Sequence, residues 1–457
     1  MSPTIALVLC TAYVIALLRI ESKSSAGVSW QLWIPIFWIF YCACGPATSW
    51  FEAGQVRSLG DSYAAGNSFE RRIQLTFIVL AAIVLMTRGF DWEWGATKNR
   101  WLFVLFAYML ISILWSDFVF VSFKRWFKSF GTLIIAFVVL TDPKPYTALQ
   151  SLFRRTAYIL IPYSILLAKY FPSLGMEFSR WSGSAMWSGV ALNKNGLGVL
   201  CLICGFFLIW RLITNWFRDK TEIPKYEQLA DLSVLAITFW LMVGGPAHSA
   251  TSVTVLMLGL VVFIAILRWR VAQKNLTLCV TLSAIAVALF TYALSYFYDT
   301  SPLEVVALLA GRDPTLTGRT DFIWSQLLPV AFQNPVLGVG YGGYWVNSFL
   351  VLNEKLSVNQ AHNGYLDVFL ELGFVGLILL AIVIIDYFRK ADAEGAWSIE
   401  WSSFRLSFLF MCLLHNWTES SFLKSTFLLW NVFILLAVVT PGNPASVPNA
   451  ENDGQVE

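Results

Sequence analysis

The chain has 457 residues, of which 57% are hydrophobic and only 13% are charged. Soluble globular proteins are about half apolar and about a quarter charged, so this composition excludes an ordinary soluble protein. The formal net charge of +3 is spread over the whole length without a Lys/Arg-rich block, so we expect no nucleic-acid partner.

Apolar segments long enough, or nearly long enough, to cross roughly 30 Å of hydrocarbon occur along most of the chain. They cover residues 4–20, 30–45, 73–87, 101–115, 126–141, 151–170, 195–215, 229–244, 251–268, 276–297, 363–388, 401–417 and 423–440. The first lacks the basic region and the small-residue cleavage site of a signal peptide, so we expect it to be retained. The sequence therefore predicts an all-α, polytopic integral membrane protein with about 12–13 transmembrane helices.

Lys and Arg residues alternate between dense and sparse connections when the N-terminus is placed outside. The dense set is predicted to be cytoplasmic, and the sparse set includes the one large connection, from Tyr298 to Ala361. We therefore expect transmembrane helices 1–10 in residues 1–297, a large periplasmic loop in 298–361, the C-terminal transmembrane helices in 362–440, and a polar tail in 441–457.

The large loop is predicted to carry two short amphipathic helices. Ser301-Pro302-Leu303-Glu304 is a capping box with proline at the first helical position. A second helix is indicated by Trp324, Leu327, Leu328 and Ala331, which recur at helical spacing before Asn334-Pro335 ends the pattern. We expect both helices on the outer membrane surface, over whatever cavity the spans enclose.

Gly318-Arg319-Thr320 places an arginine at the start of the second loop helix, where the helix dipole disfavours a cation. A bound anion would remove this conflict, because helix N-termini and guanidinium groups both bind phosphate oxygens. Arg312 is a second candidate for the same anion. The alternative is that both are solvated loop arginines paired with Asp313 or Asp321.

His362 precedes a long predicted helix, on which Asp367 and Glu371 lie one turn apart on one face. A histidine titrates near neutral pH and can accept a proton from a sugar hydroxyl. The alternative is a histidine packed on an interfacial loop. Glu371 is predicted to lie deeper, where an unpaired carboxylate is costly, so it should face a partner or a water-filled cavity. It is either catalytic, or it orients an arginine or caps a loop.

Further cations are predicted on the outer face. Arg125 is flanked by Lys124 and Lys128 at an outer helix end, and Arg180 and Lys194 lie in the connection between residues 171 and 195. Together they can form a positively charged bowl, although Lys124 and Lys128 fit a role as membrane-interface anchors better. No His/Cys/Asp spacing suggests a metal site. The letters GxGxxG at residues 338–343 follow no predicted buried strand, so we interpret them as a turn.

Several of these motifs together resemble the bacterial O-antigen ligase and polymerase superfamily, most closely its exopolysaccharide-production (succinoglycan-type) branch. The motifs are Thr317-Gly318-Arg319-Thr320 with Trp324, Asn334-Pro335 with Gly338 and Gly340, and Ala361-His362-Asn363 with Glu371 and Gly373. Further matches are Trp187-Ser188-Gly189, Asn193-Lys194-Asn195, Ser249-Ala250-Thr251-Ser252 and Asn416 with Thr418-Glu419.

The resemblance implies a GT-C-like, multi-pass glycosyltransferase of the bacterial inner membrane that needs neither metal nor cofactor. It would polymerise undecaprenyl-pyrophosphate-linked repeat units into exopolysaccharide at the outer leaflet, with inversion at the anomeric carbon. The main alternative is a ligase that transfers a lipid-linked glycan to lipid A core or to protein. A transporter is a third reading, but it predicts broken helices in two repeated halves, and the sequence shows no such repeat.

The resemblance also assigns roles to residues. His362 would be the base, Arg319 and Arg312 would hold the pyrophosphate, and Arg125 or Arg180 would complete the clamp, with Lys194 as a further cation. Glu371 joins His362 and Arg319 in the predicted catalytic set. The implied partners are the lipid-linked oligosaccharide donor and acceptor, membrane lipid, a chain-length regulator and polysaccharide export proteins.

Overall fold

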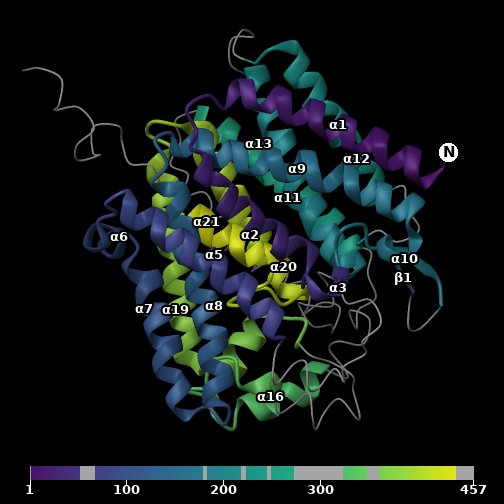
Figure 1. Ribbon diagram of the computed structural model, residues 1–457. Helices are drawn as coiled ribbons and strands as arrows, with labels where there is room; N and C mark the ends of the chain where they lie inside the picture. The colour runs from purple at the N-terminus through teal and green to yellow at the C-terminus, as the bar shows by residue number, and fades with distance from the viewer. Residues whose placement is uncertain are drawn as a thin grey trace, which may run out of the picture.

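The computed structural model describes residues 2–51, 67–178, 183–217, 223–243, 249–271, 323–346 and 360–438. Helices dominate this part of the chain (Figure 1). The exception is a short antiparallel hairpin of β1 (Met176–Phe178) and β2 (Ala185–Trp187). The predicted all-α membrane architecture is confirmed.

The helices before the hairpin are α1 (Pro3–Ser24), α2 (Trp33–Cys44), α3 (Thr48–Phe51), α5 (Ser68–Thr87), α6 (Trp92–Lys98), α7 (Arg100–Ser112), α8 (Val119–Leu140), α9 (Pro145–Tyr170) and α10 (Pro172–Gly175). Single 3₁₀ turns, Trp30–Leu32 and Ile113–Trp115, adjoin α2 and α7. The helices after the hairpin are α11 (Lys194–Phe217), α12 (Lys225–Val243), α13 (Ala250–Val271), α16 (Ser325–Ala331), α19 (Gly364–Glu394), α20 (Ile399–Thr418) and α21 (Leu428–Val438).

Five helices in the described ranges are long and apolar enough to cross a membrane, namely α1, α11, α12, α13 and α19. The pair α5 and α6, bent by 111°, would make six if it is one span. Shorter apolar helices occupy residues 30–44, 100–115 and 428–438, which were also predicted as spans. The predicted span 276–297 lies outside the described residues. The expected total of about 12–13 transmembrane helices therefore includes a segment that the described residues do not cover.

The remaining predicted spans, 126–141, 151–170 and 401–417, fall within α8, α9 and α20, which carry charged residues. In α9, Arg154 lies 3.2 Å from Glu227 of α12, and Arg155 lies 2.8 Å from Glu21 of α1. In α20, Arg405 lies 3.0 Å from Glu394. The arginines of α9 and α20 can lie in the interior because each is paired there with an opposite charge.

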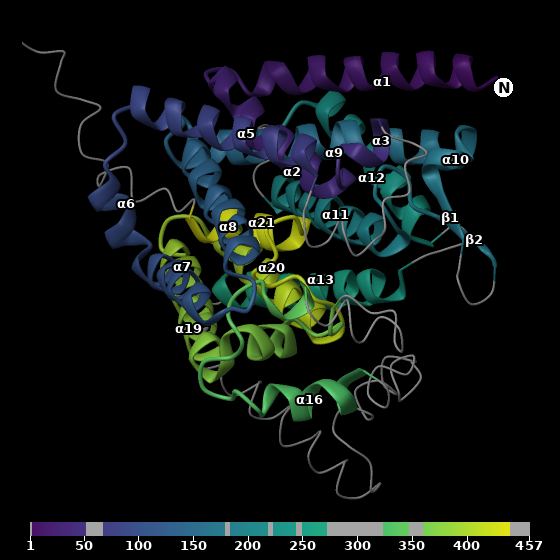
Figure 2. The ribbon, with the colours of Figure 1, turned by 60° about the horizontal axis from the view of Figure 1, so that its bottom comes forward.

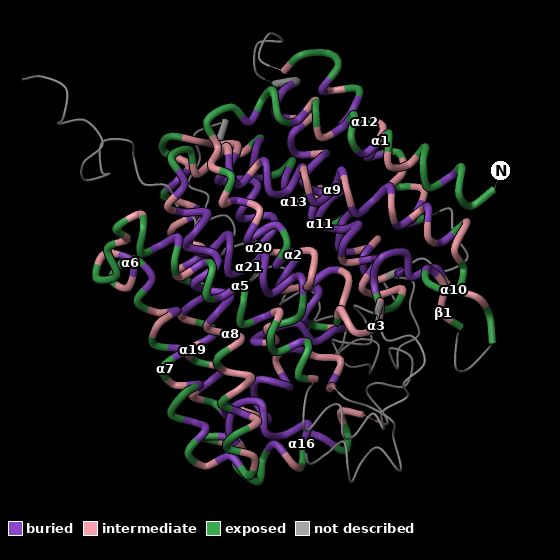
Figure 3. The backbone as a smooth tube through the Cα atoms, viewed as in Figure 1, coloured by how far each residue is buried: buried purple, intermediate pink, exposed green. Residues whose placement is uncertain are grey.

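Helices α20 and α21 lie in the middle of the bundle and are buried along most of their length (Figure 3). The side-chain oxygen of Asn431 in α21 accepts hydrogen bonds from Trp38 of α2 (2.7 Å) and Thr132 of α8 (3.0 Å), so this polar group is satisfied inside the apolar core. In contrast, α1 lies at one edge of the bundle, opposite α16 (Figure 2).

Helix α19 is broken at Gly373, whose φ of +63° and ψ of −161° are not helical. The turn before residue 341 fills the break, since the amide of Phe374 donates to the carbonyl of Pro335 (2.8 Å) and the amide of Gly340 to the carbonyl of Glu371 (2.9 Å). A Cβ at Gly373 would lie 2.3 Å from the carbonyl oxygen of Val336, so only glycine fits. Residues 338–343 are thus a turn that packs against a broken helix.

The second loop helix is confirmed as α16, but its buried face is narrower than predicted. Leu327 and Ala331 are buried, whereas Leu328 is 42% exposed. The helix packs on the first turns of α19, where its side chains join a small second core with Trp345, Phe369 and Leu370. The predicted first loop helix, at residues 301–310, lies outside the described part.

Candidate active site

A cavity of about 690 Å³ lies where segments distant in sequence meet. Its walls come from the end of α2, the start of α8, the start of α11, the turn after Gly340, the residues before α19, and the segment joining α20 to α21. The alternation of basic residues predicts all of these helix ends on the outer side of the membrane. The cavity therefore brings together charged and polar residues that were predicted on the outer face of the membrane.

His362 lies on the cavity wall just before α19 and has a φ of +50°, which is uncommon for a residue other than glycine. Its neighbours are held on both sides. The amide of Asn363 donates to Ser420 Oγ (3.0 Å), and the carbonyl of Ala361 accepts from the indole of Trp324 (2.8 Å). Such a backbone conformation costs about 1–3 kcal/mol and persists only when surrounding bonds enforce it, which indicates a positioned side chain.

The imidazole of His362 is paired with Glu419. Nδ1 lies 3.2 Å from Glu419 Oε2, while the other carboxylate oxygen, Oε1, accepts from Asn195 Nδ2 (3.2 Å). Gln360 Nε2 is also 3.3 Å from Nδ1, so the amide and the carboxylate compete for this nitrogen. The bond to the charged carboxylate is the stronger one, which favours a proton on Nδ1 and leaves Nε2 free to accept another.

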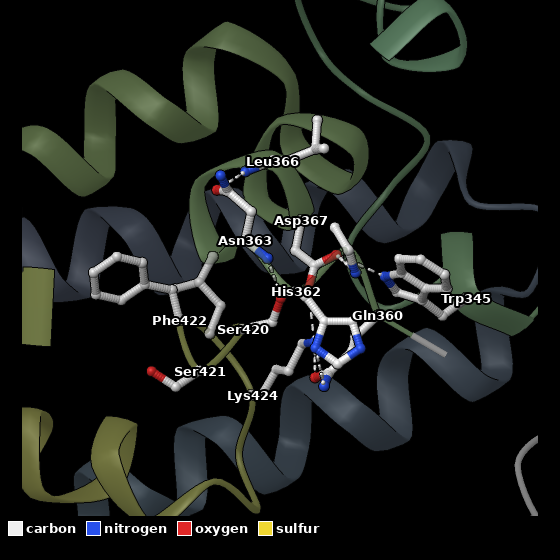
Figure 4. A network of polar contacts seen from close by, with 12 residues as sticks. Trp345, Gln360, His362, Asn363, Leu366, Asp367, Ser420, Ser421, Phe422 and Lys424 are labelled. Atoms are coloured by element: carbon white, nitrogen blue, oxygen red, sulfur yellow. Dashed lines mark hydrogen bonds and ion pairs between the residues drawn. The ribbon is translucent and has the colours of Figure 1, made fainter. Parts of the chain in front are cut away.

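Asp367, in the first turn of α19, lies close to His362 (Figure 4). Its Oδ1 accepts from the indole of Trp345 and from the amide of Ala361, both at 3.0 Å. Its Oδ2 forms an ion pair with Lys424 Nζ at 2.6 Å. Lys424 also donates to Gln360 Oε1 at 3.4 Å, so the charges near the histidine are linked.

Glu371, one turn further along α19, contacts the turn that carries Tyr341 and Gly342. Its Oε2 accepts from the amide of Gly342 (3.0 Å), and the carbonyl of the same Gly342 accepts from Arg125 Nη1 (2.5 Å). Glu371 and Arg125 both line the cavity and share one glycine. This geometry matches the alternative in which Glu371 orients an arginine and holds a loop.

Tyr341 lies on the same turn, buried against α8. Its hydroxyl is 2.7 Å from Ser129 Oγ and donates to the carbonyl of Leu423, also at 2.7 Å. Burial raises the pKa of Tyr341, so the hydroxyl keeps its proton. The tyrosine thus ties the turn to α8 and to the segment before α21.

Two cations project from α8 into the cavity. Arg125 and Lys128 both line it, three residues apart and hence on one face of the helix. Lys128 is only partly exposed, and no carboxylate in the described ranges lies within ion-pair distance of it. The sequence favoured an interface-anchoring role for Lys128, whereas the structure places it on the cavity wall.

The other predicted cations differ in position. Lys194 begins α11, where its amide donates to Glu177 Oε1 (2.7 Å), and it lines a separate space of about 10 Å³ rather than the main cavity. Arg180, Arg312 and Arg319 lie outside the described residues. Among the described side chains, no three of His, Cys, Asp or Glu are grouped as metal ligands would be.

Glu419 belongs to a sequence motif but was not among the predicted site residues, and neither was Lys424. The Asn416 motif indicates why Glu419 is well placed, because Asn416 Oδ1 accepts from the amides of Ser421 and Phe422 and so fixes the turn after α20. The sequence signal for Glu419 as the partner of His362 was its position in the motif that contains Asn416.

Comparison with known proteins supports the family that the sequence motifs predict. Residues 234–381 match the family described as O-Antigen ligase. The chain is also 26% identical over 301 residues to the exopolysaccharide production protein ExoQ of Rhizobium meliloti, an alignment that covers 63% of this chain and 64% of that protein. These matches confirm the predicted resemblance to the O-antigen ligase and polymerase superfamily. His362 and Glu371 fall inside the matched segment, while Arg125 and Glu419 reach the same cavity from outside it.

Proposed function

Because this multi-pass membrane chain carries an O-antigen ligase domain, we propose that it is a glycosyltransferase of the bacterial inner membrane. It joins undecaprenyl-pyrophosphate-linked oligosaccharide repeat units into exopolysaccharide at the outer leaflet. The observation that supports this most is one cavity that contains a histidine–carboxylate pair and two cations of α8.

The proposed reaction is an inverting displacement. An acceptor hydroxyl oxygen attacks the anomeric carbon of the donor while its proton passes to His362 Nε2. The bond from that carbon to the pyrophosphate oxygen breaks, and the electron pair leaves with undecaprenyl pyrophosphate. Glu419 stabilises the imidazolium that forms, and general base catalysis of this kind typically contributes about 10²–10⁴-fold in rate.

The leaving pyrophosphate gains negative charge as the glycosidic bond breaks. Arg125 and Lys128 supply positive charge on the cavity wall, and Glu371 helps to fix Arg125 through Gly342. Arg312, Arg319 and Arg180 remain proposed contributors to the same anion site. Charged donors placed in advance at a leaving group stabilise the transition state without divalent metal, so we propose a metal-independent reaction.

The acceptor distinguishes polymerase from ligase. The printed name of the Rhizobium meliloti relative refers to exopolysaccharide production, which favours a growing polysaccharide as acceptor. The family description refers to a ligase, which favours lipid A core or protein. The proposed partners are the lipid-linked donor and acceptor, together with a chain-length regulator and export proteins.

The test is turnover by the purified protein in liposomes, with a lipid-pyrophosphate oligosaccharide as donor. We expect a ladder of polymer without another acceptor, loss of the ladder in His362→Ala, and a slower ladder in Lys128→Gln that Lys128→Arg partly restores. Asp386→Asn is a matched control, because Asp386 pairs with Lys390 towards the far end of α19 (2.7 Å). Product formed only with lipid A core would identify a ligase. Movement of the lipid-linked sugar across the bilayer without any glycosidic bond would identify a transporter.

A further inference from the structure

Asp367 connects three segments of the chain through one carboxylate. It is 3% exposed, and its two oxygens contact the turn that carries Trp345, the backbone before His362, and Lys424 in the segment between α20 and α21 (Figure 4). The three contacting groups are an indole N–H, an amide N–H and an ammonium. Every one of them is a donor or a positive charge, which indicates that Asp367 is ionised in the folded protein.

Two features favour the charged form at this depth. Asp367 lies in the first turn of α19, where the helix dipole stabilises a negative charge. Lys424 provides a counter-charge at 2.6 Å, without which a buried carboxylate would be costly. The arrangement is therefore a buried ion pair at Oδ2, with two hydrogen bonds accepted by the other oxygen, Oδ1.

The pair reaches His362 by two routes. The first is the backbone, because the amide of Ala361, held by Asp367, belongs to the residue directly before His362 with its strained φ. The second runs through side chains, because Lys424 donates to Gln360 Oε1 and the amide nitrogen of Gln360 lies 3.3 Å from His362 Nδ1. Removal of the negative charge at Asp367 would leave the positive charge of Lys424 uncompensated near the imidazole.

We infer that Asp367 is a positioning residue for the base, an inference that rests on the proposed role of His362. It holds the backbone at residue 361 so that the imidazole keeps its place on the cavity wall. It also neutralises Lys424, so that this ammonium does not oppose the imidazolium that forms during the reaction. Asp367 itself touches no reacting atom.

The charge that His362 experiences comes from several elements. The groups that face it or share its cavity are Glu419 after α20, Lys424 before α21, Asp367 and Glu371 on α19, Arg125 and Lys128 on α8, and His415 on α20. Asp367 and Lys424 form a direct ion pair, so they can be altered as a matched set whose net charge stays constant. This makes a charge-balanced test possible.

The first variant is Asp367→Asn, which keeps an oxygen acceptor for Trp345 and Ala361 but removes the negative charge. We expect kcat to fall about tenfold, because the charge that holds the backbone before His362 and neutralises Lys424 is lost, while the KM for donor stays within about twofold. The second readout is independent of turnover. The pH midpoint for modification of His362 by diethyl pyrocarbonate, followed by peptide mass spectrometry, should move to lower pH, because an uncompensated ammonium disfavours the imidazolium.

The second variant is Lys424→Gln alone, which leaves the negative charge of Asp367 without its partner. The midpoint for His362 should then move to higher pH, the opposite direction. The double variant Asp367→Asn with Lys424→Gln restores neutrality, so its midpoint should return close to that of the unmodified protein. Asp386→Asn serves as the control on the same helix and should leave the midpoint unchanged.

The inference is overturned if either single variant leaves both kcat and the midpoint unchanged, or if the double variant does not restore the midpoint. A purely structural role would lower the yield of folded protein but leave the midpoint and the rate per folded molecule unchanged. The midpoint is measured without substrate, so failure of the proposed function can be distinguished from failure of this inference. If only the proposed function is wrong, the wild-type protein makes no polymer, while the opposite midpoint shifts of the two single variants still appear.

Discussion

Glu419→Gln is the substitution that most directly tests the proposed base. Glutamine has the same shape as glutamate but carries one donor and one acceptor. Asn195 donates to Glu419 Oε1, so we expect the glutamine oxygen to keep that bond and the amide nitrogen to face His362. The amide would then donate to Nδ1, the proton would reside on Nε2, and the nitrogen that should accept the proton of the acceptor would already carry one.

The magnitude follows from the geometry. A full ion pair at the 3.2 Å between His362 Nδ1 and Glu419 Oε2 has a Coulomb ceiling of about 5 kcal/mol at an effective dielectric constant of about 20. The side chains are 25% and 10% exposed, so water screens part of this energy. Hydrogen bonds to charged groups contribute roughly 1.5–3 kcal/mol, and we therefore expect a loss in kcat of about 10–150-fold.

The assay is the initial rate of polymer formation by purified protein across a range of pH. Without the carboxylate the imidazolium is less stable, so the neutral base persists to lower pH. The acid limb of the pH–rate profile therefore moves to lower pH. Glu419→Asp should retain part of the rate because it keeps the charge, and Asp386→Asn should behave like the unmodified protein. A normal rate with an unmoved acid limb in Glu419→Gln would refute the pairing of Glu419 with the catalytic base.

Four further outcomes follow from the structure and the sequence. Gly373→Ala should sharply reduce the yield of folded protein, because the new Cβ would lie 2.3 Å from the carbonyl oxygen of Val336. The backbone conformation at this position also costs residues other than glycine about 1–3 kcal/mol or more. A normal yield and stability of Gly373→Ala would show that the break in α19 is not required. Arg319→Ala should slow turnover about 10²–10³-fold without loss of folding, with partial rescue by Arg319→Lys; an unchanged rate would make it an ordinary loop arginine. Turnover should survive EDTA, and loss with recovery on adding Mg²⁺ or Mn²⁺ would contradict the metal-free reaction. A cysteine at Ser348 should react with an impermeant thiol reagent added outside intact cells, and labelling only after lysis would reverse the predicted topology.

The class of protein is predictable from the sequence alone. Lipid can surround only segments whose backbone bonds are satisfied internally, so long apolar runs predict membrane helices without knowledge of their packing. The motifs around His362 and Glu371 likewise indicated the superfamily, because they are local in sequence, and both residues lie in the segment that matches the O-antigen ligase family. Helix α16 was predictable for the same reason, since its spacing of apolar residues is a local property.

The charges that act together could be identified only once the packing of the helices was known. Glu419, the partner of His362, lies 57 residues away in the sequence. Arg125 and Lys128 line the same cavity, although several helices separate them from His362 in the sequence. Sequence periodicity reports which face of a helix is apolar, but it does not report the rotation and axial offset of one helix against another. Those depend on side-chain packing throughout the core, and they place Lys128 on the cavity wall while Lys194 lies outside it.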